Sequence, residues 1–79
     1  MQTLLIHVAS EEPILAEVED LPTHDATLIY AINPRRRDGK EVHYVLPEVQ
    51  TLIIPFWRIN FVQILPTGEE EEIVAFFKD

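Results

Sequence analysis

The segment that most constrains the fold is residues 53–65, Ile-Ile-Pro-Phe-Trp-Arg-Ile-Asn-Phe-Val-Gln-Ile-Leu. It contains the single tryptophan and a dense run of β-branched and aromatic residues, which are enriched in strands. From Trp57 onward, apolar and polar positions alternate as in a half-buried strand. Pro55 cannot donate to a sheet ladder, so we predict a bend between a strand ending near Ile54 and a longer one beginning near Trp57. We expect Trp57 to be buried and the rest of the chain to pair with or cover this unit.

The chain length and composition predict one thin domain, residues 1–79. A chain of 79 residues buries only about 60–65% of its unfolded surface. Apolar residues make up 47% of the sequence, but without cysteine neither disulfides nor thiolate zinc sites can reinforce the core. We therefore expect a homo-oligomer, in which another subunit covers part of the apolar surface.

The N-terminus predicts a cytoplasmic protein. It lacks a basic region followed by a long apolar run, as a signal peptide would have. No apolar stretch reaches the roughly 18 residues needed to span a bilayer. We expect no membrane partner.

Charge is unevenly distributed along the chain. The net charge is −8, which argues against broad attraction to nucleic acid or anionic membranes. Four of the six basic residues fall in residues 35–40, whereas acids gather in residues 11–25 and 69–72. The sequence therefore predicts a bipolar molecule.

Short alternating segments predict a succession of strands. In residues 3–8, Leu4, Ile6 and Val8 share one face. Residues 14–19 fit either a strand or two helical turns, and we favour the strand because so short a helix gains little without packing. The further predicted strands are residues 26–32, which are apolar on both faces and so expected to be central or covered, and residues 42–46 and 49–54.

A hairpin and a helix complete the predicted elements. Asp38-Gly39 suits a type I′ turn, in which Arg37 would face Lys40 and Arg36 would face Glu41. At the C-terminus, residues 68–78 have a capping-box pattern, acids in the first turn and apolar residues on one face. We predict a short amphipathic helix there.

Five to six short strands closed by a helix predict a mainly β fold, a small strongly bent antiparallel sheet or barrel. Residues 13–64 resemble the Sm-like (LSm) small β-barrel. The resemblance lies in the acid-rich strand of residues 14–19, the hairpin, and residues 53–64, which are similar to the last two barrel strands and the tight turn between them. The family's RNA-contacting signatures, an Asp followed by Met-Asn and a later Arg-Gly pair, are absent, although Arg58 lies near the second. The resemblance implies a barrel of Sm/SH3-like architecture and, as an alternative function, RNA or nucleotide binding.

The basic hairpin is the strongest candidate for a binding site. The candidate anion- or partner-binding residues are Arg35, Arg36, Arg37, Lys40 and Arg58. The candidate aromatic contacts are Tyr30, Tyr44 and Trp57. Guanidinium groups bind phosphate bidentately, and an aromatic ring can stack on a base. We favour a second interpretation, in which the hairpin docks on the acids of a neighbouring subunit or partner. A third is that the charges only keep a hairpin end soluble.

Nothing in the sequence predicts catalysis, a metal or a cofactor. The spacing of His7, His24 and His43 matches no metal motif, and without cysteine a zinc site would need carboxylates. Ser10 has no paired base. We predict a non-enzymatic domain that works by self-assembly and partner binding, with RNA or nucleotide binding by the hairpin as the alternative.

Overall fold

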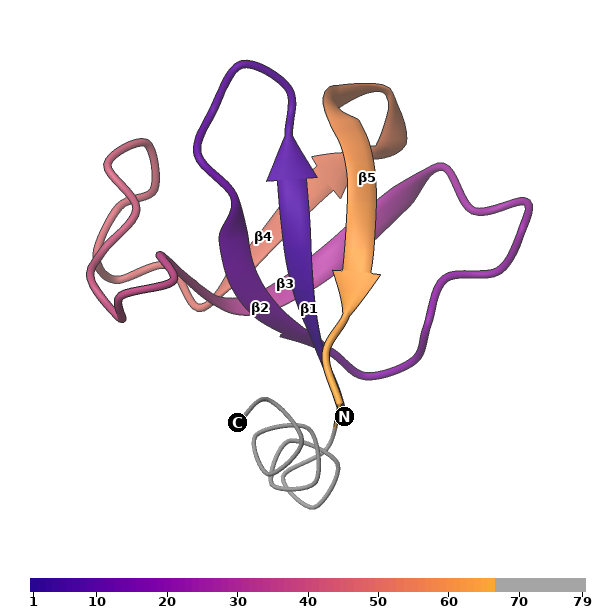
Figure 1. Cartoon of the computed structure of the whole chain (residues 1–79), viewed down its shortest axis with the longest axis horizontal. Coiled ribbons are helices and arrows are strands. Elements are labelled where there is room, and N and C mark those ends of the chain that lie inside the picture. Colours follow the sequence, from indigo (N-terminus) through magenta and orange to yellow (C-terminus); the bar gives the residue numbers. More distant parts are fainter. Residues whose placement is uncertain (67–79) are drawn as a thin grey trace, which may run out of the picture.

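The computed structural model describes residues 1–66, which form five strands and a short 3-10 turn (Figure 1). The elements are β1 (Gln2–Val8), β2 (Ile14–Val18), β3 (Leu28–Arg35), β4 (Thr51–Pro55), η1 (Phe56–Arg58) and β5 (Ile59–Ile64). The predicted mainly β fold is confirmed, as is the strand preferred for the segment after Pro13. The helix predicted for residues 68–78 lies outside the described residues.

The strands form one antiparallel sheet in the order β4-β3-β2-β1-β5. It curls into a half-barrel, and η1 carries the chain from the edge strand β4 to the edge strand β5 (Figure 1). The concave side holds the core, whose buried members are Leu4, Ile6, Val8, Ile14, Ala16, Val18, Ile29, Ala31, Val42 and Ile54. Leu4, Ile6 and Val8, which the sequence placed on one face of a strand, all belong to this core.

A bulge in β3 sharpens the curl of the sheet. The pairing passes from Leu15 opposite Arg35 to Glu17 opposite Ile32, so β3 has one extra residue in this interval. Asn33 lies within it and has φ +54°, a left-handed conformation that Asn adopts more readily than most residues. Bulges of this kind bend a strand and increase its twist. β3 also runs to Arg35, three residues beyond the predicted end.

A second bulge changes which residues of β5 face the core. Val8 pairs with Ile59 and His7 pairs with Phe61, so Asn60 is an extra residue. Ile59 packs against the core, whereas Phe61 is 55% exposed. The predicted alternation across residues 57–64 is therefore interrupted.

The expected burial of Trp57 is wrong, because its side chain is 79% exposed. The predicted bend at Pro55 is confirmed, but it continues as a 3-10 turn and the last strand begins at Ile59. With three residues per turn, side chains three apart share a face. Phe56 and Ile59 both pack on the core, and Trp57 faces away.

The predicted type I′ hairpin is also wrong. The Gly39 N–H donates to the Arg36 carbonyl and the Arg36 N–H donates to the Lys40 carbonyl, each over 2.9 Å. Gly39 has φ +86°, but Asp38 does not have a positive φ, and a type I′ turn needs it at both central residues. Arg36 therefore lies opposite Lys40 and not Glu41.

Residues 42–46 are not the predicted strand but part of a loop of turns between β3 and β4. The Val45 N–H donates to the Val42 carbonyl over 3.0 Å, which closes one turn. Val42 is buried and Val45 packs against the core. A strand would place residues three apart on opposite faces, whereas a turn lets both contact the same core.

Candidate binding surfaces

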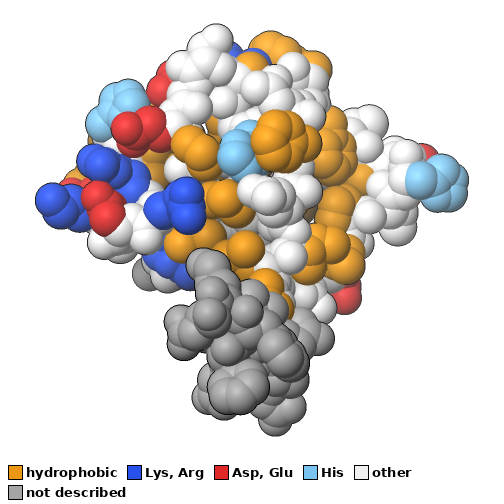
Figure 2. Space-filling view, in the orientation of Figure 1, with side chains coloured by type: hydrophobic (Ala, Val, Ile, Leu, Met, Phe, Trp, Pro, Cys, Tyr) orange, Lys and Arg blue, Asp and Glu red, His pale blue; other side chains and the backbone are white. Residues whose placement is uncertain are grey.

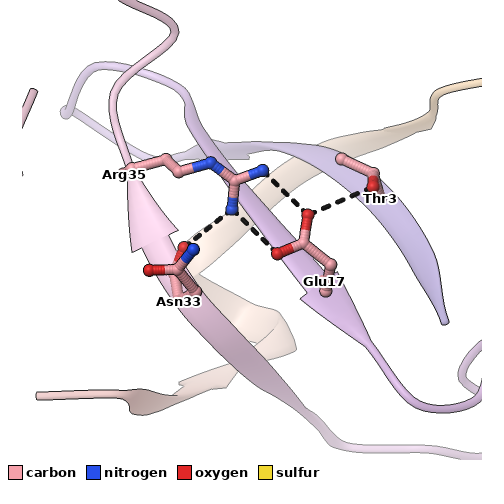
Figure 3. Close-up of polar contacts among 4 residues, drawn as sticks. All are labelled: Thr3, Glu17, Asn33 and Arg35. Carbon is pink, nitrogen blue, oxygen red and sulfur yellow. Dashed lines mark hydrogen bonds and ion pairs between the residues drawn. The ribbon is translucent and has the colours of Figure 1, made fainter. Parts of the chain in front are cut away.

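Arg35 is held within the sheet and not presented to a ligand (Figure 3). Its Nη1 and Nη2 donate to Oε1 and Oε2 of Glu17 over 2.9 and 2.8 Å, and Nη1 also donates to the Asn33 carbonyl over 2.9 Å. Thr3 Oγ1 donates to the same carboxylate over 3.1 Å, so the network joins β1, β2 and β3. The Arg35 hydrogen bonds lower the pKa of Glu17, and the Glu17 carboxylate raises the pKa of Arg35.

We call residues 35–40 the basic loop. Its other basic residues, Arg36, Arg37 and Lys40, are only partly free to bind a ligand. Arg36 lies with Nε 3.6 Å from Glu12 Oε2 and with Nη2 3.2 Å from Asp38 Oδ2. Arg37 and Lys40 are exposed, and neither forms an ion pair with a residue in the described range 1–66. Two of the four predicted bases therefore remain available.

Arg58 and Tyr44 line one hollow, and none of residues 35–40 contributes to it. Arg58 Nη2 donates to the Ala9 carbonyl over 3.2 Å, and its guanidinium carbon is 5.7 Å from the Trp57 ring centre. Tyr44 and Arg58 line an open hollow of about 170 Å³. Burial raises the pKa of Tyr44, with a further contribution from the Glu11 carboxylate.

The predicted binding residues are not gathered into one site. The basic loop lies at the left end of the longest axis in Figure 1, and η1, which carries Trp57, lies at the upper right. Tyr30 projects from β3 opposite Ile53 of β4. In Figure 2, Lys and Arg side chains gather mainly at that left end. Phosphates held by the basic loop would therefore lie away from Tyr30 and Trp57.

A groove that we did not predict from the sequence lies beside β3 and the β2–β3 connection. We call it the acidic groove; it has a volume of about 260 Å³. Its lining includes the side chains of Glu19, Asp20, Pro22, Ala26, Leu28 and Tyr30. Residues 19–34 contain three acids and no Lys or Arg. The sequence signal was that residues 26–32 are apolar on both faces, from which we expected a central or covered strand. β3 does lie between β2 and β4, but Tyr30 is 59% exposed.

Large apolar side chains are exposed around both edges of the sheet. They are Tyr30 and Ile53 on β3 and β4, Trp57 on η1, and Phe61 and Ile64 on β5. Phe61 stacks on His7 with 4.0 Å between ring centres, and His7 Nε2 is hydrogen-bonded to Gln63 Oε1 over 2.9 Å. The surface around β5 is therefore apolar, with a polar contribution from His7.

The histidines are dispersed over the fold. His7 lies on β1, His24 in the β2–β3 connection, and His43 in the β3–β4 loop, where its Nε2 is 3.6 Å from Glu11 Oε1. Within residues 1–66, no three His, Asp or Glu side chains form a group able to hold a metal ion. The same range has no helix of the length and apolarity required to cross a bilayer.

Comparison of the chain with known protein families, curated proteins and solved structures finds no match. What is established is the small curled antiparallel sheet. The resemblance of residues 13–64 to the Sm-like barrel stays a prediction.

Proposed function

We propose that this chain is a non-enzymatic domain that functions by self-assembly and by binding partner proteins. The observation that carries the proposal is the exposure of large apolar side chains around β4 and β5, the two edge strands of the sheet that residues 1–66 form. Removing apolar surface from water is favourable by about 25 cal/mol per Å². Edge strands also present unpaired backbone groups to which another chain can bond. A second subunit could cover the exposed apolar side chains and could also bond to the backbone groups of an edge strand.

The proposal includes an Sm-like barrel and a cytoplasmic location. The barrel is supported by the similarity of residues 53–64 to the last two strands of that family, and by the short turn η1 between β4 and β5. Self-assembly does not depend on either.

Light scattering after size-exclusion chromatography tests the proposal. We expect a molar mass that is a multiple of 9.2 kDa and that falls on dilution as subunits separate. A mass of 9.2 kDa at every concentration up to the high micromolar range would refute self-assembly.

The alternative is RNA or anion binding by the basic loop, and the exposed Arg37 and Lys40 support it. Two bases neutralise at most two phosphates, which predicts a log–log salt slope of about 1.4 on single-stranded RNA. Titration of labelled oligo-U at about 50 mM salt would measure the slope. Loss of micromolar binding in the Arg37→Glu, Lys40→Glu variant would favour this function. The absence of binding at that salt would exclude it.

A further inference from the structure

Trp57 is the most exposed large apolar side chain in residues 1–66, at 79%. The turn that carries it is ordered: the Phe56 N–H donates to the Thr27 carbonyl over 2.9 Å, and the Ile59 N–H donates back to the Phe56 carbonyl. Phe56 packs on the core. The indole is thus presented to solvent in a defined position, and tryptophan is enriched among the residues that dominate binding energy at interfaces.

The acidic groove has the size and chemistry to accept an aromatic side chain. Its volume of about 260 Å³ leaves room for one aromatic side chain. Tyr30 supplies an exposed aromatic wall, and Glu19 and Asp20 supply negative charge. Neither acid forms an ion pair with another residue in the part of the chain that the structure describes.

Trp57 and one end of the acidic groove lie near the same end of the β3–β4 strand pair. Leu28, which lines the groove, pairs with Pro55, and Thr27 bonds to Phe56. The indole does not fill the groove of its own chain, because it is exposed. One copy can therefore offer its Trp57 indole to the acidic groove of a second copy and accept the indole of that copy in return. A two-fold symmetric dimer requires a self-complementary surface of this kind.

Charge complementarity favours the same arrangement. Arg58 follows Trp57, and its guanidinium carbon lies 5.7 Å from the ring centre, so it would approach a partner together with the indole. The groove offers Glu19 and Asp20 to this cation. Opposite charges placed across an interface fix its orientation and select the partner.

We propose that two copies of this chain form a dimer in which Trp57 of each copy inserts into the acidic groove of the other, with Arg58 beside Glu19 and Asp20. This rests on the proposed self-assembly and names the surface that performs it.

Intrinsic fluorescence tests the dimer directly, because Trp57 is the only tryptophan. We expect its emission to shift to shorter wavelength as concentration rises, in step with an increase in mass to twice 9.2 kDa. In the dimer, the apolar residues that line the acidic groove replace water around the indole.

Three variants of the full chain locate the contact. Trp57→Ala should weaken dimerisation about thirtyfold or more, as for a hot-spot aromatic residue. The double variant Glu19→Lys, Asp20→Lys should weaken it about tenfold. Glu48→Lys is the matched control: it makes the same type of charge change at an exposed position in the β3–β4 loop and should leave the dissociation constant within about twofold. Circular dichroism verifies that each variant is folded.

Any of the following outcomes would overturn the proposed dimer. If Trp57→Ala dimerises normally, or if the mass doubles without a shift in emission, the copies assemble through another surface and the proposed function survives. If emission is already at short wavelength in a 9.2 kDa species, residues of the same chain cover the indole. A wild-type chain that is monomeric at all concentrations, with emission typical of exposed tryptophan, refutes both the dimer and self-assembly.

Discussion

Replacing Glu17 by Gln tests whether the Arg35 network stabilises the sheet. Glu17 accepts two hydrogen bonds from Arg35 and one from Thr3, and through them connects β1, β2 and β3 (Figure 3). The amide of Gln has one acceptor oxygen and no charge. The variant would therefore keep the shape of the side chain but lose the ion pair and at least one hydrogen bond.

The expected loss in the free energy of unfolding is about 2 kcal/mol, between the cost of a surface pair and that of a buried pair. The side chains of Arg35 and Glu17 are 27% and 22% exposed, so solvent screens the pair only in part. A hydrogen bond to a charged group contributes about 1.5–3 kcal/mol. For a domain of this size, a change of 2 kcal/mol corresponds to a decrease in Tm of about 8–16 °C.

The pH dependence of stability gives the prediction a second readout. Arg35 lowers the pKa of Glu17 in the folded state below its ordinary value of 4.5. The ion pair therefore stabilises the fold fully at pH values above 4.5, and its contribution is lost as the pH falls through the lowered pKa. Glu17→Gln lacks this component, so the stabilities of wild type and variant should converge at acidic pH.

Thermal melts followed by circular dichroism at neutral and acidic pH measure both effects. Glu48→Gln, at an exposed position in the β3–β4 loop, is the matched control and should melt with the wild type. A Tm for Glu17→Gln within about 2 °C of wild type at neutral pH would refute the stabilising role of the network. So would a difference in Tm that persists unchanged at low pH.

Three further predictions follow from burial and backbone conformation. Trp57→Ala, at a concentration where the chain is monomeric, should change the free energy of unfolding by less than about 0.5 kcal/mol in urea titrations, because the side chain is 79% exposed. Ile6→Ala should lower it by about 2–5 kcal/mol in the same assay, because Ile6 is fully buried in β1; a cost equal to that of Trp57→Ala would contradict the assigned core. Gly39→Ala should cost about 1–2 kcal/mol from its φ of +86° alone, since no atom would crowd the added Cβ; an unchanged Tm would argue against the left-handed turn.

Local sequence was sufficient where a residue and its near neighbours determine the structure. The alternation in residues 3–8 placed Leu4, Ile6 and Val8 on one face, because successive strand residues point to opposite faces, and all three are buried. Pro55 marked the end of β4, because it lacks the N–H that a sheet ladder needs. The same reasoning failed at Trp57, because three residues of 3-10 turn change the period from two to three.

The candidate binding residues show a similar division. The sequence identified the basic loop, but it could not show that Arg35 is bonded to Glu17, a partner 18 residues away. That contact depends on the register between β2 and β3, which the bulge around Asn33 sets. Arg36 likewise meets Glu12 across the fold, so the charge available to a ligand is smaller than the sequence suggests.

The fold class, the strand positions near Pro55 and in residues 3–8, and the concentration of bases in residues 35–40 could all be predicted from the amino-acid sequence. Each of these follows from side-chain type, alternation or backbone chemistry within a few residues. Tertiary structure alone decided that Trp57 is exposed, that Arg35 is occupied, and that Tyr30 and Glu19 line one groove. These features depend on strand order, register and bulges, which bring together residues that are distant in sequence.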